Sequence, residues 1–226
     1  LTITFADQAC ATWIRPYVER MRPSNIQNGK KDVSVKEKCL AVLKRYGLAP
    51  DIRGKYPFQL SGGMTRRVLI STAVMEKPKL VIADEPTPGL HLEAATRVMG
   101  HFREMADDGA GVLLITHDLE LALLTADRVI VLYGGRVVEE TDAAAFQDER
   151  NLKHPYTKAL LGAIPIPDPD IPAMQDMLEG DVPSPINPPK GCCFHTRCHG
   201  CCKECTAQKP KLINVGNDHW VACCKV

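Results

Sequence analysis

The stretch "KLVIADEPTPGLHLEAATRVMGHFREMADDGAGVLLITHD", Lys79 to Asp118, predicts the fold. It contains two short apolar runs, at 79–83 and 112–116, each the length of a buried strand. Between them, from about Leu92 to Asp108, apolar residues recur on one face of a helix. Two buried strands joined by a helix form a parallel βαβ unit. The sequence therefore predicts an α/β protein with a parallel sheet core.

The residues before this unit are predicted to be mainly helical. A loose helical pattern covers 7–22, and Ser34 with Glu37 forms a capping box before an amphipathic helix that Gly47 ends. A further helix is predicted to begin at "LSGGMTRRVLI", Leu60 to Ile70, and to end at the Lys-Pro break before the first strand.

The residues after this unit predict a hairpin, a short helix and a connector. "RVIVLY" and "RVVEE" flank a Gly134-Gly135 turn, a helical segment covers 154–164, and eight prolines lie between Pro165 and Pro189. We therefore predict four segments, which are a helical subdomain at 1–76, a partial sheet core at 77–150, a helical then proline-rich connector at 151–190 and a cysteine-rich extension at 191–226.

Composition excludes several classes of protein. The 226 residues are 45% hydrophobic, and 28 basic against 27 acidic residues give a formal net charge of +1. This charge provides no strong field for nucleic acid or an anionic membrane, so we expect no nucleic-acid partner. No apolar run approaches the ~18 residues of a membrane-spanning helix, and no secretory signal is visible at the start of the chain.

Cysteine is concentrated near the C-terminus. Eight of the ten cysteines lie between Cys192 and Cys224, which predicts a separate module there. Since the sequence shows no secretory signal, metal binding is favoured over a disulfide framework.

Three polar groups are candidates for one site. Ser61, Gly62 and Gly63 open a predicted helix, whose exposed amides and dipole suit a phosphate. Asp84 and Glu85 end one predicted strand and His117 follows the next, so the three side chains are expected at one edge of the sheet. A carboxylate there can hold Mg²⁺ or activate a water. Taken alone, each motif is also compatible with an ordinary helix cap or a solvated strand end.

In order and spacing, "LSGGM", "LVIADEPT" and "LLITHD" resemble the signature motif, the Walker B motif and the switch histidine of an ABC-type ATPase. "HPYTKALLGAIP", "GDVPSPINPP" and "GCCFHTRC" resemble the C-terminal extension of ATP-binding subunits from the peptide and nickel import group. The resemblance implies a partial P-loop NTPase fold of the ABC type, with the signature motif in the helical subdomain and a small cysteine-rich extension.

The resemblance also implies roles for the candidate residues. In this family two subunits enclose two ATP molecules, so Ser61, Gly62 and Gly63 would contact ATP bound to a partner. Asp84 would hold Mg²⁺, while Glu85 and His117 would be catalytic toward ATP held by their own chain. His91 stands where the family usually has Asp, in the loop that communicates between the two ATP sites.

The family's Walker A loop has the pattern GxxxxGK followed by Ser or Thr. No such stretch is present, since neither of the Gly-Lys pairs before Asp84, Gly29-Lys30 and Gly54-Lys55, is followed by Ser or Thr. We expect the chain to be a fragment, because a parallel sheet without the Walker A strand would have an unpaired central edge. A natural half-site subunit is the alternative. In either case, ATP binding by this chain alone is expected to be weak or absent.

The cysteine-rich extension resembles a family frame that holds a 4Fe-4S cluster, and that frame maps onto Cys192, Cys198, Cys205 and Cys223. The other cysteines create C-x-x-C pairs that would equally suit tetrahedral zinc. We favour the iron-sulfur cluster, with zinc second and redox-active or merely reduced thiols third.

The resemblance implies an ATPase subunit that energises import of peptides or nickel and lies peripherally at the cytoplasmic face of the membrane. Its expected partners are a second ABC ATPase subunit, membrane permease subunits and, indirectly, an extracytoplasmic solute-binding protein. The main alternative is a non-hydrolytic regulatory or metal-binding protein that has lost its own ATP site. A non-transport ABC ATPase is a weaker one.

Overall fold

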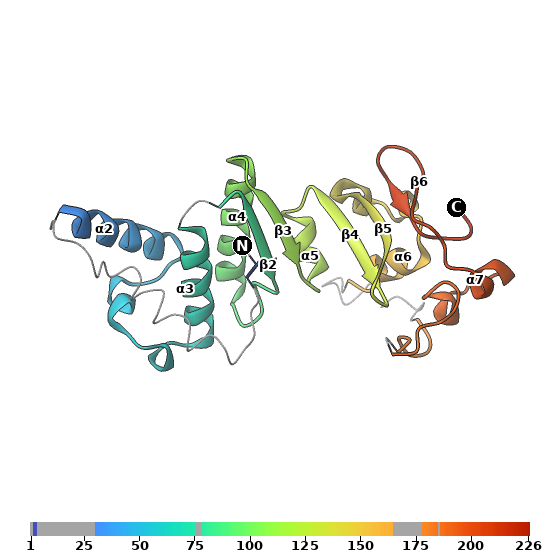
Figure 1. Cartoon of the computed structure of the whole chain (residues 1–226), viewed down its shortest axis with the longest axis horizontal. Helices are drawn as coiled ribbons and strands as arrows, with labels where there is room; N and C mark the ends of the chain where they lie inside the picture. The colour runs from blue at the N-terminus through green and yellow to red at the C-terminus, as the bar shows by residue number, and fades with distance from the viewer. Residues whose placement is uncertain (1, 4–29, 76–77, 165–177, 185) are drawn as a thin grey trace, which may run out of the picture. The chain divides into compact units, whose positions relative to one another are not determined.

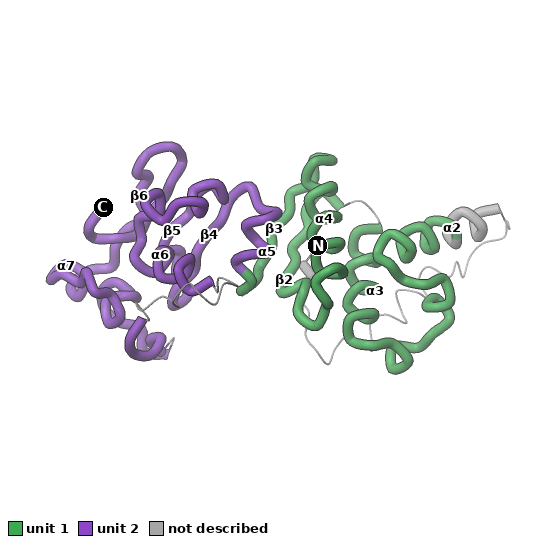
Figure 2. The backbone as a smooth tube through the Cα atoms, turned by 180° about the vertical axis from the view of Figure 1, so that it is seen from behind, with its two compact units in different colours: residues 1–118 green, residues 119–226 purple. Residues whose placement is uncertain are grey.

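The computed structural model of the protein describes residues 2–3, 30–75, 78–164, 178–184 and 186–226 (Figure 1). The backbone forms two compact units, Leu1–Asp118 and Leu119–Val226, which Figure 2 shows in separate colours. The predicted helix at 7–22 lies outside the described residues. The predicted division into four segments stays a prediction.

A three-stranded parallel sheet in the order β1, β2, β3 forms the centre of the first unit (Figure 1). Strand β1 (Thr2–Ile3) pairs with β2 (Leu80–Asp84), and β2 pairs along its whole length with β3 (Gly111–Ile115). Helix α4 (Leu92–Asp107) connects β2 to β3. The predicted parallel βαβ unit and the α/β fold class are therefore confirmed.

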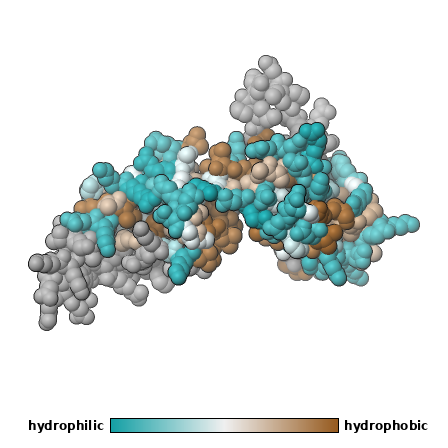
Figure 3. Space-filling model, turned by 90° about the horizontal axis from the view of Figure 1, so that it is seen from above, coloured by the Kyte–Doolittle hydropathy of each residue, from teal (hydrophilic) through white to brown (hydrophobic). Residues whose placement is uncertain are grey.

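Helix α4 has a continuous apolar face, and the helix lies against β3. Its buried residues are Ala94, Ala95, Val98, Met99 and Phe102, and Val81 and Ala83 of β2 are buried as well. Alternate strand residues point to opposite faces, so the sheet also presents apolar side chains to solvent. Nearly half of the surface of Leu80, Leu113 and Ile115 is exposed. Figure 3 shows hydrophobic residues at the surface among hydrophilic ones as well.

Helix α2 (Lys30–Arg45) begins before the predicted capping box. Ser34 therefore lies inside the helix, and the predicted start is wrong because Lys30 to Val33 contain no helix breaker. The predicted end is confirmed, since Gly47 has φ of +64°, a conformation that glycine adopts without steric cost.

Helix α3 (Gly62–Val74) follows two short 3-10 turns, η1 (Pro50–Gly54) and η2 (Pro57–Gln59). Among the described helices of both units, none is long and apolar enough to cross a membrane.

The second unit is built on a four-stranded antiparallel sheet in the order β4, β5, β7, β6. Gly134 and Gly135 both have positive φ, which confirms the predicted tight turn between the first two of these strands. The elements of this unit are α5 (Leu119–Leu123), β4 (Arg128–Tyr133), β5 (Arg136–Asp142), η3 (Ala143–Gln147), η4 (Glu149–Asn151), α6 (Pro155–Gly162), η5 (His195–Arg197), α7 (Lys203–Ala207), β6 (Ile213–Asn214) and β7 (Trp220–Val221).

The cysteine-rich segment shares the hydrophobic core of this unit. Cys192, Cys193 and Cys205 are buried in one cluster with Phe194 and with residues of β4 and β5. The Phe194 ring meets that of Tyr133 edge-on, with centroids 5.1 Å apart. The thiols therefore act here as small apolar groups.

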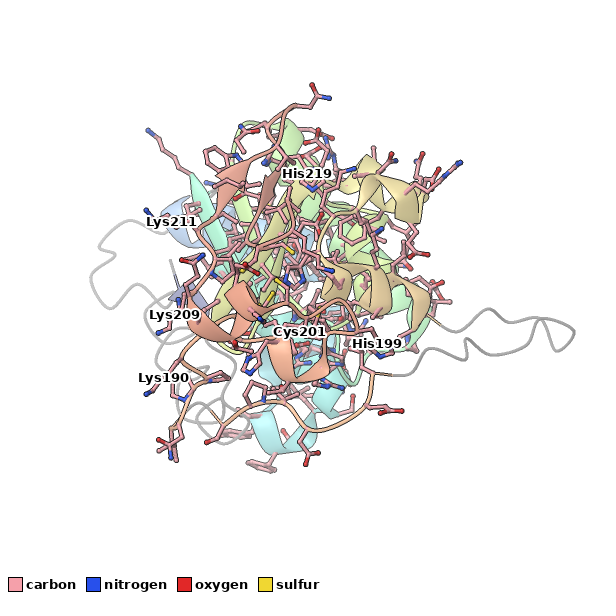
Figure 4. The ribbon with its side chains drawn as sticks, turned by 90° about the vertical axis from the view of Figure 1, so that its right-hand side faces the viewer. Lys190, His199, Cys201, Lys209, Lys211 and His219 are labelled. Carbon is pink, nitrogen blue, oxygen red and sulfur yellow. The ribbon has the colours of Figure 1, made fainter. Side chains whose placement is uncertain are left out.

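A buried carboxylate joins three parts of this unit. Glu139 of β5 is fully buried, and its Oε1 accepts hydrogen bonds from the Lys153 amide at 2.7 Å and from His219 Nε2 at 2.6 Å. Its Oε2 accepts one from the His154 amide at 3.0 Å. His219, labelled in Figure 4, belongs to the turn before β7. The Glu139 side chain thus connects strand β5, the start of helix α6 and the turn before β7.

We expect Glu139→Gln to destabilise the second unit by roughly 3 kcal/mol, because an amide nitrogen would face a donor and the histidine would lose its charged partner. Glu140→Gln is the matched control. Glu140 is partly exposed and pairs with Arg128 at 3.0 Å, so its loss should cost less than about 1 kcal/mol. Hydrogen exchange followed by mass spectrometry would measure the loss of stability of the second unit in each variant. Equal losses in the two variants would contradict the role given to Glu139.

Candidate functional site

Ser61 caps helix α3. Its backbone is extended, and its Oγ accepts a hydrogen bond from the Met64 amide at 3.3 Å. Ser61 and Gly62 are both exposed. The predicted helix start is therefore confirmed, and the cap and the first residue of α3 are open to solvent.

The third residue of this loop lies against the segment that follows β2. A Cβ atom on Gly63 would lie 3.2 Å from the Gly89 carbonyl oxygen and 3.3 Å from Leu90 Cδ2, closer than most Cβ contacts. The Arg66 guanidinium donates a hydrogen bond to the Pro88 carbonyl oxygen. The start of α3 and the Pro88–Leu90 loop are thus held together inside one chain.

Arg67 is a positioning residue that the motif comparison did not single out. Its guanidinium donates to the carbonyl oxygens of Gly63 at 3.3 Å, Tyr46 at 3.2 Å and Gly47 at 3.0 Å. These bonds connect the start of α3 to the end of α2. The sequence signal that could have indicated the bond to Gly63 is the i, i+4 spacing of Gly63 and Arg67, which places both residues on one side of a helix.

The carboxyl ends of strands β2 and β3 lie side by side at one edge of the sheet, as expected. Asp84 is the last residue of β2 and pairs with Ile115, and the Glu85 amide donates to the Ile115 carbonyl at 2.8 Å. His117 follows two residues later. Glu85 has φ of +44°, the left-handed region that side-chain-bearing residues rarely adopt and that concentrates at functional sites.

Glu85 and His117 are hydrogen-bonded. Glu85 Oε1 accepts from the His117 amide at 3.1 Å and lies 2.8 Å from His117 Nδ1. Glu85 Oε2 is buried and has no hydrogen-bond partner within the described residues. A buried acceptor without a partner is costly, so this oxygen is suited to a water or a ligand.

The hydrogen bond that His117 makes to the Glu85 carboxylate, together with the negative charge of that carboxylate, raises the pKa of His117 above the usual value. Since Nδ1 faces the carboxylate, Nε2 is the ring nitrogen left to meet a ligand. The imidazole is largely exposed, with 80% of its side-chain surface open, so a ligand can reach it.

His91 caps helix α4. Its backbone is extended, and its Nδ1 accepts a hydrogen bond from the Ala94 amide at 3.3 Å. An Asp at this position would cap the helix in the same way.

The predicted metal centre is not supported. Among the described residues, no three or more His, Cys, Asp or Glu side chains are grouped so that they could hold a metal ion. Cys205 of the predicted frame instead has its Sγ 3.2 Å from that of Cys202, which lies outside the frame.

A parallel sheet with an Asp-Glu pair and a histidine at one edge, next to a capped Ser-Gly-Gly helix start, defines an ATP-binding cassette protein. Residues 6–88 match the family described as ABC transporter, and residues 138–205 match the C-terminal region of oligopeptide/dipeptide transporters. The chain belongs to the ATP-binding proteins of this ABC transporter family, as its sequence resemblance predicted.

The two relatives named OppF support this assignment. The oligopeptide transport ATP-binding protein OppF of Haemophilus influenzae is 41% identical over 85% of this chain, and OppF of Escherichia coli is 39% identical over 85%. The chain spans 58% of the length of each. A solved dimeric ATP-binding cassette in a post-hydrolysis state is 27% identical over 56% of each chain, with a TM-score of 0.49.

We expect Glu85→Gln to lower the pKa of His117 toward its ordinary value of about 6.5, because the carboxylate stabilises the imidazolium. The stabilisation from the raised pKa is present below the pKa of the unfolded chain and is lost as pH rises through the folded value. Asp118→Asn, the matched control, should lower the pKa less, since Asp118 contributes least. NMR titration of the His117 imidazole measures its pKa in each variant. An unchanged pKa in Glu85→Gln would contradict the pairing of Glu85 with His117.

Proposed function

We propose that the chain is part of an ATP-hydrolysing subunit that energises peptide import through an ABC transporter. The observation that carries the proposal is the buried Glu85 Oε2, which has no hydrogen-bond partner among the described residues and belongs to the carboxylate that His117 contacts. Glu85 follows Asp84 directly in the sequence. Family membership supports the reaction class, and the names of the relatives support the cargo.

Glu85 is proposed as the general base for the attacking water. Its Oε1 is held by two donors from His117, so the carboxylate cannot rotate freely. The other oxygen, Oε2, is then available to orient a water and to accept its proton. His117 is proposed to donate from Nε2 to the γ-phosphate when the imidazole is protonated.

Asp84 is the residue proposed to hold Mg²⁺. A carboxylate at the carboxyl end of a parallel strand supplies the oxygen ligand that this ion prefers. Bound Mg²⁺ would neutralise charge on the phosphates. The other proposed residues of the site contact phosphate, orient the attacking water and accept its proton.

Ser61, Gly62 and Gly63 are proposed to contact ATP held by a second ATPase subunit. The exposed first turn of α3 provides amides and a partial positive charge for a phosphate group. This role requires a dimer of ATPase subunits.

We further propose that the dimer acts on membrane permease subunits from the cytoplasmic face, with an extracytoplasmic solute-binding protein supplying the cargo. Peptides are proposed rather than nickel because the relatives reported above are named as oligopeptide transport proteins.

Fused behind a relative's segment that contains a GxxxxGK loop, the chain should hydrolyse ATP in the presence of Mg²⁺. Glu85→Gln should lower kcat by about 100-fold or more while ATP still binds, because the base is lost and the nucleotide contacts are not. A steady-state phosphate-release assay and a binding titration measure the two quantities.

Glu93→Gln is the control, since Glu93 is exposed on α4 and paired with Arg97. Its turnover should stay within about twofold of the parent. Full turnover in Glu85→Gln would remove Glu85 from this role, and ATP binding without turnover in the parent fusion would favour the non-hydrolytic alternative.

Gly62→Asp in the same fusion should weaken ATP-dependent dimerisation by roughly tenfold or more, since a carboxylate would face the partner's phosphate. A Cβ on Gly62 meets no atom within 4 Å, so folding should be unaffected. Gly54→Asp is matched, because Gly54 is equally open but lies in η1. Sedimentation in the Glu85→Gln background measures the dimer, and equal weakening by both substitutions would contradict the proposed contact.

A further inference from the structure

A histidine of helix α4 holds the end of helix α2. His101 Nδ1 lies 3.1 Å from Arg45 Nε, and His101 Nε2 lies 3.0 Å from the Arg45 carbonyl oxygen. The imidazole also packs against the ring of Tyr46, with centroids 4.6 Å apart. Only 12% of the His101 side-chain surface is exposed, so the end of α2 covers most of this ring.

These contacts require one protonation state of the imidazole. A carbonyl oxygen only accepts a hydrogen bond, so His101 Nε2 carries the ring proton. The guanidinium Nε of Arg45 only donates, so His101 Nδ1 is unprotonated and accepts. Both bonds are therefore made by a neutral ring, and the bond from Arg45 is lost when Nδ1 takes up a proton.

A partner for the protonated ring is already in place. Glu104 Oε2 lies 3.3 Å from His101 Nδ1, and the same carboxylate oxygen pairs with Arg45. The hydrogen bond from Arg45 is the largest cause that lowers the pKa of Glu104, so this carboxylate stays ionised near neutral pH. On protonation, the imidazole would exchange a bond between helices α2 and α4 for a bond within α4.

The junction also contains two further guanidinium groups and a buried phenol. A Cβ on Gly47 would lie 2.9 Å from Arg97 Nη1 of α4 and 3.4 Å from Arg67 Nη1 of α3. Burial raises the pKa of Tyr46 to about 12, so its hydroxyl stays neutral. An imidazolium would thus add positive charge to a site rich in cations, at hydrogen-bond distance from Arg45. This repulsion favours movement of the Arg45 side chain away from α4.

The end of α2 in turn supports the turn at the start of α3. The Arg67 guanidinium donates to the carbonyl oxygens of Tyr46 and Gly47 and also to that of Gly63. A movement at the end of α2 therefore reaches the Gly63 backbone through a single side chain.

We propose that His101 is a proton-sensitive positioning residue for the turn formed by residues 61–63. With a neutral ring, Arg45 is bound and the end of α2 is fixed on α4. Protonation of Nδ1 releases the Arg45 side chain, loosens the end of α2 and shifts the turn through Arg67. This sensitivity belongs to the folded chain without nucleotide, so its test is separate from the test of ATP hydrolysis.

NMR of the full chain tests the proposal from about pH 5 to 8, where imidazole changes charge. The ring nitrogen shifts of His101 should show the Nε2–H tautomer at the upper end of this range. On protonation, the hydrogen-bonded amides of Tyr46, Gly47 and Leu48 should exchange about threefold faster or more, after correction for the intrinsic pH dependence of exchange. The amide signal of Gly63 should shift with the same midpoint.

Two variants should remove this pH dependence. His101→Gln removes the titrating ring, and Arg45→Met removes the side chain that protonation releases. Lys44→Met is the matched control, because Lys44 is also an exposed cation in the last turn of α2. Its pH dependence should stay within about twofold of that of the parent. Arg45→Met alone suffices if the enclosed His101 position does not tolerate replacement, since Arg45 is exposed.

Three results would overturn the proposal. One is the Nδ1–H tautomer of His101 at the upper end of the pH range, which would exclude the bond from Arg45. Another is amide exchange at the end of α2, or a Gly63 signal, that does not change across the range in the parent chain. The third is equal pH dependence in Arg45→Met and Lys44→Met, which would assign the effect to another group.

Discussion

The parallel pairing of β2 with β3 is the constraint on which the site depends. The hydrogen bond from the Glu85 amide to the Ile115 carbonyl continues this ladder one residue beyond the strand. It brings Glu85 to His117, which lies 32 residues away along the chain. Because strand side chains alternate between faces, a slip of one residue would turn these groups away from each other.

Hydrophobic pattern and turn chemistry predicted most of this architecture. Strands β2 and β3, helix α4 and the glycine turn before β5 follow from short apolar runs, a helical period and two glycines, all of which are local signals. The early start of α2 was missed because the Ser-x-x-Glu pattern of a capping box can also occur inside a helix, and no helix breaker precedes Ser34 in Lys30 to Val33. The left-handed backbone of Glu85, and the lack of a partner for its Oε2 among the residues that the structure describes, depend on packing and have no signal in the sequence.

The C-terminal half shows a different limit. A dense run of cysteines predicted a separate metal module, yet Cys192 and Cys205 are buried in a core with β4 and β5. A thiol is both a metal ligand and a small apolar group, and spacing does not distinguish these uses. Glu139 was missed for a related reason, because a glutamate in a strand is usually exposed, and only the folded chain shows its three donors.

The close approach of Gly63 to the Gly89 carbonyl, together with the hydrogen bond from Arg66 to the Pro88 carbonyl, has a consequence for cooperativity. The loop that follows Glu85 is thus held against the turn that is proposed to receive a neighbouring subunit's nucleotide. A displacement of the loop would then be expected to change the position of this turn. In the proposed dimer, linkage would make this influence reciprocal for binding, so nucleotide at one site would change the affinity of the other site by the same factor as the reverse.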